Sequence, residues 1–180
     1  AYHGRTLACI TAGGNLKNQK GFEPLLPGFL RVPFNDIPAI IAAAKAHPDI
    51  AAILVEPILG EKGIIVPADD YLRKIRKICD EHKWLMMLDE VQTGLGRTGT
   101  FFRYQAEGIV PDVVALAKGL ANGVPIGACL AALPYADLFE PGSHGTTFGG
   151  NHLSCASPLA TLRVVEDEQL VQQEKKKGLV

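Results

Sequence analysis

The sequence predicts an α/β fold, with a mostly parallel sheet flanked by helices. Short, continuously apolar segments alternate along the 180 residues with segments whose apolar residues recur every three or four positions. Continuous apolar runs are typical of strands buried on both faces of a parallel sheet, and the longer period is typical of amphipathic helices. Apolar residues make up 47% of the chain and charged residues 21%, close to the averages of globular proteins with a packed core.

The beginning of the chain predicts two helices separated by a long irregular connection rich in Gly, Pro and Asn. The first is a short helix over residues 5–12, and the second covers residues 37–46. Pro38 lies where proline is favoured, in the first turn of the second helix. Asn35 or Asp36 is the expected N-cap, because both side chains can accept a hydrogen bond from the first turn.

Four strands and one helix are predicted in the middle of the chain. The strands are the apolar runs 50–55, 84–88, 113–117 and 126–132. The helix covers residues 69–83, where apolar residues recur at helical spacing. This alternation of strands and helices favours a doubly covered, mostly parallel sheet.

The last segment, residues 151–177, predicts one long helix with Pro158 within its first turns. The chain starts without Met and stops within this helix, so we expect a fragment of a longer protein. No linker divides the chain, and no internal repeat is visible.

Composition and charge exclude several classes of function. The formal net charge is −1, which offers no basic surface for nucleic acid or a membrane. No apolar run is long enough to span a bilayer, and no secretory signal is recognisable. The cysteines, at positions 9, 79, 129 and 155, form no CxxC pair, so we predict no metal site. We expect them to be buried free thiols in a reducing cytoplasm.

Three predicted strands are each followed by an ionisable residue, namely Glu56, Asp89 and Lys118. In open α/β sheets ligands bind beyond the carboxyl ends of the strands. A single polar residue at a strand end is often there only because it reaches water. Three in succession, with Gly-rich loops after them, favour a functional site.

Lys118 and Asp89 together indicate a particular chemistry. Lys118 follows five apolar residues, and we expect it in a desolvated pocket, where the neutral amine is favoured. A neutral amine can form a Schiff base with an aldehyde. A carboxylate facing a protonated pyridine nitrogen strengthens the ring as an electron sink, and this pair recurs around pyridoxal phosphate.

Five segments of the sequence resemble, in order and approximate spacing, the signatures of the class III (ornithine-type) aminotransferases. They are residues 2–6, 55–63, 88–99, 116–127 and 144–151. The resemblance implies the large domain of a fold-type I transferase that uses pyridoxal 5′-phosphate. Residues 1–150 would form its central part, and residues 151–180 would be a helix leading toward a small domain.

The resemblance implies roles toward the cofactor. Lys118 would carry the cofactor and shuttle a proton between the substrate carbon and the cofactor's C4′, and Asp89 would hold the pyridinium nitrogen. Gln92 would hydrogen-bond the phenolic oxygen, and Tyr2, where the family more often has Phe, would stack on the ring. The expected cofactor contacts are Tyr2, Asp89, Glu90, Val91, Gln92, Lys118 and Thr147.

The resemblance also implies partners and substrate contacts. Thr147 would bind the cofactor phosphate of the neighbouring subunit, which implies a homodimer with shared active sites. Arg5 and Thr146 resemble substrate contacts. Glu61 resembles the acidic residue near the substrate entrance, whose arginine partner lies outside this sequence. Each of these residues alone could be an ordinary surface or turn residue, and the roles depend on the motifs occurring together.

Within the family, residues 31–36 and the segment 89–94 are most similar to acetylornithine aminotransferases of arginine biosynthesis. The implied reaction moves the terminal amino group of N-acetylornithine to 2-oxoglutarate. Ornithine, succinylornithine, 4-aminobutyrate and succinyl-diaminopimelate are alternative donors. A mutase of the same fold, which needs no 2-oxoglutarate, is a further alternative.

Two other classes of protein compete with this interpretation. Residues 94–99 fit the G-x-G-x-x-G pattern of a nucleotide-dependent oxidoreductase. However, polar residues separate the pattern from the strand, no clear helix begins at Gly99, and no acidic residue lies near position 119. The other competitor is a non-catalytic relic that packs but binds no cofactor, against which the presence of both Lys118 and Asp89 argues.

Overall fold

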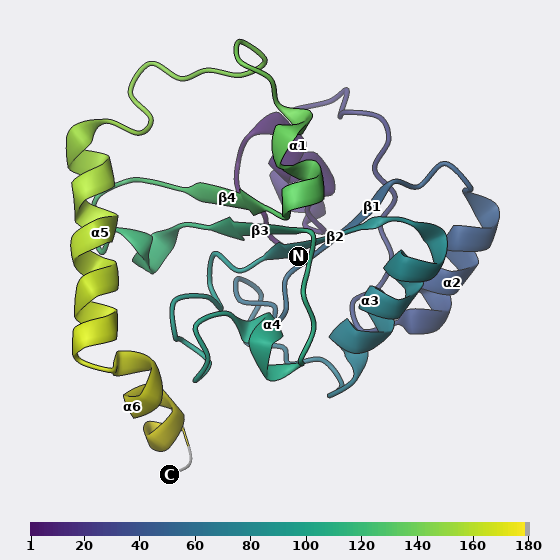
Figure 1. Cartoon of the computed structure of the whole chain (residues 1–180). Helices are drawn as coiled ribbons and strands as arrows, with labels where there is room; N and C mark the ends of the chain where they lie inside the picture. Colours follow the sequence, from purple (N-terminus) through teal and green to yellow (C-terminus); the bar gives the residue numbers. More distant parts are fainter. Residues whose placement is uncertain (179–180) are drawn as a thin grey trace. The chain divides into compact units, whose positions relative to one another are not determined.

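Strands and helices alternate through the chain, as the sequence predicts, in a computed structural model that describes residues 1–178 (Figure 1). The chain divides into two units, Ala1–Met86 and Met87–Val180. Strand β2, Leu85–Asp89, begins in the first unit and ends in the second.

The first unit contains most of the predicted helices. Its elements are α1 (Leu7–Ala12), the 3₁₀ turn η1 (Leu16–Asn18), α2 (Ile37–Ala46), β1 (Ala52–Val55) and α3 (Tyr71–His82). Asp36 is the N-cap of α2, because its carboxylate accepts a hydrogen bond from the Ala39 N–H at 2.9 Å. Asn35, the other candidate, instead accepts from the Ala68 N–H at 3.1 Å.

Helix α3 supplies much of the core of the first unit. Its buried face follows the helical period and consists of Tyr71, Leu72, Ile75, Ile78 and Cys79. Full burial of one such aliphatic side chain contributes about 1.5–3 kcal/mol. Lys83 ends the helix in a left-handed conformation, with φ 57°, and the chain then enters β2. The Leu85 N–H donates to the Ala51 carbonyl at 2.9 Å, so β1 lies beside the start of β2.

The second unit continues the sheet and ends in two helices. Its elements are α4 (Arg103–Ala106), β3 (Val113–Leu116), η2 (Lys118–Leu120), β4 (Ala128–Ala131), η3 (Leu133–Leu138), α5 (His152–Asp167) and α6 (Leu170–Lys177). β2 pairs with β3 in parallel, whereas β3 pairs with β4 antiparallel. The strand order is β1-β2-β3-β4. Buried Val114, Leu116 and Leu120 form the core here.

The prediction that every strand is buried on both faces is wrong for two of them. Leu54 of β1 is 39% exposed, and Leu130 of β4 is 45% exposed. β4 is the last strand in the order of the sheet. A short apolar run does not by itself distinguish a buried central strand from an edge strand.

The predicted single helix over residues 151–177 is two helices. Asn151 caps α5 by accepting from the Ser154 N–H at 3.0 Å, and Pro158 is accommodated inside that helix. Gln169 adopts φ 52°, which breaks the α-helical ladder before α6 begins. Its own N–H donates to the Glu166 carbonyl at 3.0 Å, so a hydrogen-bonded turn joins the two helices.

The cysteines differ from the expectation of four buried thiols. Cys79 is buried in α3, but Cys129 and Cys155 are exposed and Cys9 is half-buried. Cys129 is exposed because it lies on the exposed edge strand β4. In residues 1–178 no helix combines the length and apolar character needed to cross a membrane.

Candidate active site

Asp89 and Lys118 both lie at the carboxyl end of the parallel β2–β3 pair. Asp89 ends β2 and is paired with Ala115 of β3. The Glu90 N–H continues the ladder by donating to the Ala115 carbonyl at 3.0 Å. β3 ends at Leu116, and Lys118 begins the turn η2. This edge of a sheet is where ligands of α/β proteins bind.

Lys118 leaves the sheet in a left-handed conformation, with φ 43°. Its side-chain nitrogen donates a hydrogen bond to the amide oxygen of Gln92. Non-glycine residues rarely adopt this backbone region, and such outliers cluster at functional sites. Lys118 is exposed within residues 1–178, so the expected desolvated pocket stays a prediction. The apolar residues before Lys118 place it at a strand end but do not cover its side chain.

The turn after β2 presents Gln92 to Lys118. Asp89 Oδ1 accepts from the Val91 N–H at 3.0 Å, and the Gly94 N–H closes the turn on the Glu90 carbonyl at 2.9 Å. A Cβ at Gly94 would lie 2.8 Å from that carbonyl oxygen and 2.9 Å from a methyl of Leu116. Glycine at this position therefore lets the turn pack directly against β3.

The sequence predicts that Glu90 contacts the cofactor, but its side chain accepts hydrogen bonds from groups of the protein. It is only 1% exposed. Its Oε2 accepts from the Thr93 hydroxyl and the Arg103 N–H, both at 2.8 Å, and its Oε1 accepts from the Tyr104 N–H at 3.0 Å. Burial raises the pKa of Glu90 above its ordinary value, although these hydrogen bonds oppose the rise. The structure thus gives Glu90 the task of holding α4 and the Gln92 turn.

Tyr2, Arg5 and Glu61 belong to the first unit. The Tyr2 N–H donates to Glu56 Oε1 at 2.7 Å, and the Arg5 guanidinium carbon lies 5.7 Å from the centroid of the Tyr2 ring. This is the range of a cation–π interaction. Glu61 is exposed and lines a small cavity of about 10 Å³ together with Tyr2, Glu56 and Lys62. The structure therefore brings all three predicted side chains of this unit into one neighbourhood.

Thr146 and Thr147 lie on the exposed connection between η3 and α5. The Thr146 hydroxyl accepts from the Gly149 N–H at 3.1 Å, which is a local turn contact. Within residues 1–178, no hydrogen bond joins either threonine to Gln92 or Lys118. Their roles toward phosphate and substrate remain predictions.

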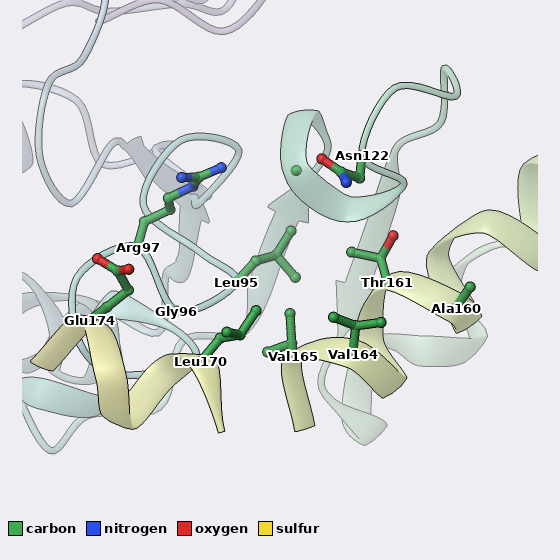
Figure 2. A pocket seen from close by; sticks show the side chains of 11 residues that line it. Leu95, Gly96, Arg97, Asn122, Ala160, Thr161, Val164, Val165, Leu170 and Glu174 are labelled. Atoms are coloured by element: carbon green, nitrogen blue, oxygen red, sulfur yellow. The ribbon is translucent and has the colours of Figure 1, made fainter. Parts of the chain in front are cut away.

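A cavity of about 420 Å³ in the second unit is lined by none of Asp89, Gln92 and Lys118 (Figure 2). Figure 2 shows the side chains of Leu95, Val165 and Leu170 directed toward one another from a loop and two helices. Gly119 contributes to the lining, whereas its neighbour Lys118 does not. The cavity is bounded by residues 95–97, by Gly119 and Asn122, and by helices α5 and α6.

The Gly-rich loop, residues 94–99, is not a dinucleotide-binding turn. The helix that follows it, α4, has four residues and starts at Arg103. Gly96 and Gly99 are instead covered by α6, since their Cβ positions would lie 2.9 Å from Val171 Cγ2 and 3.3 Å from the Lys175 backbone. A phosphate could not approach these glycines in this arrangement. Residues 1–178 also contain no group of three or more His, Cys, Asp or Glu side chains that could hold a metal ion.

The chain belongs to the class-III aminotransferase family, because residues 1–180 match that family over their whole length. Its curated relatives include acetylornithine aminotransferases of Nitrosomonas europaea and Gloeobacter violaceus. The first is 53% identical over 95% of this chain, and the second is 50% identical over 99%. The chain spans 44% of the length of each of these relatives.

Solved structures agree with the sequence relatives. An ornithine aminotransferase from Toxoplasma gondii superimposes with a TM-score of 0.94 at 37% identity, over 99% of this chain and 42% of that one. Pyridoxal phosphate partly occupies the active site of that protein. An acetylornithine aminotransferase from Elizabethkingia anophelis superimposes with a TM-score of 0.81 at 44% identity, over 85% of this chain and 40% of that one. The predicted fold class is thereby confirmed.

Proposed function

We propose that the full-length protein is a pyridoxal-phosphate-dependent aminotransferase in which Lys118 carries the cofactor. The observation that supports this most directly is the grouping of Lys118, Gln92 and Asp89 at the carboxyl end of the β2–β3 pair. An amine able to attack an aldehyde, an amide beside it and a carboxylate on the neighbouring strand form a set that suits this cofactor. The residues present therefore fit pyridoxal phosphate.

Lys118, Asp89 and Gln92 would each have a separate role toward the cofactor. When bound, pyridoxal phosphate supplies an aldehyde that takes up an amino group and a ring that withdraws electrons. Lys118 would hold that aldehyde and then carry a proton between the substrate carbon and C4′. Asp89 would keep the pyridine nitrogen protonated through its negative charge. Gln92 accepts from Lys118 with its amide oxygen, so its amide nitrogen can donate to the phenolic oxygen.

The proposed amino donor is N-acetylornithine, and the proposed acceptor is 2-oxoglutarate, which becomes glutamate. The protein would then act in arginine biosynthesis. The proposal is supported by relatives named acetylornithine aminotransferase, which are 53% and 50% identical in sequence to this chain. Arg5, Glu61 and Thr146 are the proposed substrate contacts.

The proposed assembly is a cytoplasmic homodimer with shared active sites. Thr147 of one subunit would bind the cofactor phosphate of the other. Residues 1–150 would form the central part of the cofactor-binding domain, and residues 151–180 would lead toward a small domain. Analytical ultracentrifugation of the full-length protein tests the dimer. Thr147→Val should weaken cofactor binding while the protein remains a dimer.

The decisive experiment is to map the cofactor on the full-length protein. The protein is incubated with pyridoxal phosphate, reduced with borohydride and analysed by peptide mass spectrometry. We expect a phosphopyridoxyl group on the peptide that contains Lys118, and no such group in Lys118→Ala. The absence of an adduct from a folded wild-type protein would favour a relic or a nucleotide-dependent enzyme, and NAD binding would then be measured.

The donor is identified by a second assay on the same protein. Glutamate formation from 2-oxoglutarate is compared with N-acetylornithine and with ornithine as donors. We expect a higher kcat/KM with N-acetylornithine than with ornithine. Lys118→Ala should form no glutamate with either donor. A preference for ornithine would reassign the substrate while leaving the cofactor chemistry unchanged. Turnover without 2-oxoglutarate would indicate a mutase.

A further inference from the structure

Glu56 is a buried carboxylate to which the proposed reaction assigns no role. It follows Val55, the last residue of β1, and is only 6% exposed. Burying a carboxylate is unfavourable unless hydrogen bonds compensate for the lost water. The partners of Glu56 therefore indicate which part of the structure its charge stabilises.

Both oxygens of Glu56 accept hydrogen bonds from the backbone. Oε1 accepts from the Tyr2 N–H at 2.7 Å, and Oε2 accepts from the Gly60 N–H at 3.2 Å. Tyr2 is 54 residues away in the sequence, whereas Gly60 lies in the turn just beyond β1. One side chain thus ties the segment that carries Tyr2 to the turn that carries Glu61.

The two segments joined by Glu56 carry all the predicted site residues of the first unit. Tyr2 and Glu61 line the same cavity, whose volume of about 10 Å³ leaves space for no more than about one water. The Arg5 guanidinium lies over the Tyr2 ring, so the position of that ring also affects Arg5. Holding the Tyr2 backbone therefore limits the positions available to both side chains.

We propose that Glu56 is a positioning residue for the cofactor site: its carboxylate holds the Tyr2 backbone so that the ring can stack on pyridoxal phosphate. The inference rests on the proposed function, in which the Tyr2 ring makes that contact. Glu56 itself would touch neither cofactor nor substrate. It acts through Tyr2, and this dependence can be measured.

A carboxylate suits this task better than an amide. Both oxygens of Glu56 accept, whereas glutamine has one acceptor oxygen and one donor nitrogen. Glu56→Gln therefore leaves one backbone N–H facing an NH₂ group. Because a buried hydrogen bond to a charged group is lost, we expect pyridoxal phosphate to bind about tenfold more weakly.

The test measures cofactor binding by the full-length apoenzyme, independently of turnover. Fluorescence titration gives the Kd for pyridoxal phosphate, and visible circular dichroism of the bound cofactor reports the orientation of its ring. The proteins are wild type, Glu56→Gln, Tyr2→Ala and the double variant. Glu81→Gln, which changes an exposed carboxylate on α3, is the matched control and should equal wild type in both measurements.

The double variant separates positioning from a general structural effect. We expect Glu56→Gln to raise the Kd about tenfold when Tyr2 is present. In the Tyr2→Ala background the same substitution should raise it less than about twofold, since no ring is left to position. We also expect Glu56→Gln and Tyr2→Ala to change the dichroism band in the same direction. Additive effects on Kd, or a wild-type Kd and band in Glu56→Gln, would overturn the inference.

Two further outcomes are distinguishable. A folded wild-type protein that binds no pyridoxal phosphate would overturn the proposed function, and this inference with it. If Glu56→Gln fails to fold, Glu56→Asp replaces it, because its shorter carboxylate keeps the charge but cannot reach both N–H groups. Wild-type Kd and dichroism in a folded Glu56→Asp would then count against the inference.

Discussion

The Lys118 side chain donates a hydrogen bond to the Gln92 amide oxygen across 26 residues of sequence. Two separate turns at the ends of neighbouring parallel strands make this contact. Gln92 is carried by the turn that Gly94 allows to pack against β3, and Lys118 begins η2. The contact fixes the position of the amine beside the turn after β2. In the proposed function this would be a form of preorganisation.

Replacing Gln92 should impair the reaction more than the fold. Gln92→Leu removes the acceptor for Lys118 and the proposed donor for the phenolic oxygen, while the side chain is exposed and carries little packing. Loss of a hydrogen bond to a charged group should lower kcat/KM about 10- to 100-fold. Steady-state kinetics and thermal melting of the full-length protein check this. Gln172→Leu, at an exposed position of α6, is the control, and an unchanged kcat/KM in Gln92→Leu would contradict the role.

Removing the charge of Asp89 should slow the chemical step strongly. Asparagine keeps an oxygen for the Val91 N–H, so the turn should persist, but it cannot stabilise a pyridinium by charge. We expect Asp89→Asn to lower the single-turnover rate at least about 100-fold. Asp80→Asn, on the exposed side of α3, should leave the rate unchanged. A wild-type rate in Asp89→Asn would mean that the ring nitrogen is held by another group.

Glu90 should make the stability of the protein depend on pH. Burial raises its pKa above the ordinary 4.5, so the folded protein holds this proton more tightly than the unfolded chain. The stabilising contribution is therefore complete below the ordinary pKa and is lost as the pH rises through the raised pKa. Glu90→Gln has no such proton, and its amide also leaves a backbone N–H unpaired, at a cost of about 1–3 kcal/mol.

The difference in unfolding free energy between wild type and Glu90→Gln should consequently be larger at about pH 4 than at about pH 7. Urea unfolding at the two pH values measures it. Other titrating groups are common to both proteins and cancel in the comparison. The exposed control Glu81→Gln should differ little from wild type at either pH. A difference for Glu90→Gln that grows with pH would contradict a raised pKa of Glu90 in the folded protein.

The contact of α6 with the Gly-rich loop can be tested by a pair of glycine substitutions. Gly96 and Gly108 both have positive φ, 88° and 65°, so alanine at either carries a similar backbone cost of about 1–2 kcal/mol. A Cβ at Gly96 would also lie 2.9 Å from Val171 Cγ2, whereas a Cβ at Gly108 meets nothing within 4 Å. We expect Gly96→Ala to lose about 1–3 kcal/mol more stability than Gly108→Ala in urea unfolding. Equal losses would show that α6 can move away from the loop without cost.

Much of the fold could be predicted because the relevant signals are local. The bounds of α2 follow from Pro38 and an Ala-rich stretch within one short segment, whereas the choice of Asp36 over Asn35 as its cap came from the structure. The buried face of α3 follows from its helical period. The position of Lys118 at a strand end follows from the apolar run before it. The break at Gln169 escaped prediction, because glutamine is an ordinary helix former and nothing in its neighbourhood requires φ 52°.

The sequence by itself determined the alternation of the four strands with helices α1, α2 and α3, the residues at the strand ends and the family motifs, since these depend on neighbours along the chain. Only the tertiary structure decided that Lys118 meets Gln92 while remaining exposed, and that Glu90 holds α4. It alone decided that the buried Glu56 holds the Tyr2 backbone. Burial and choice of partner depend on segments that are distant in sequence, and local periodicity carries no information about them.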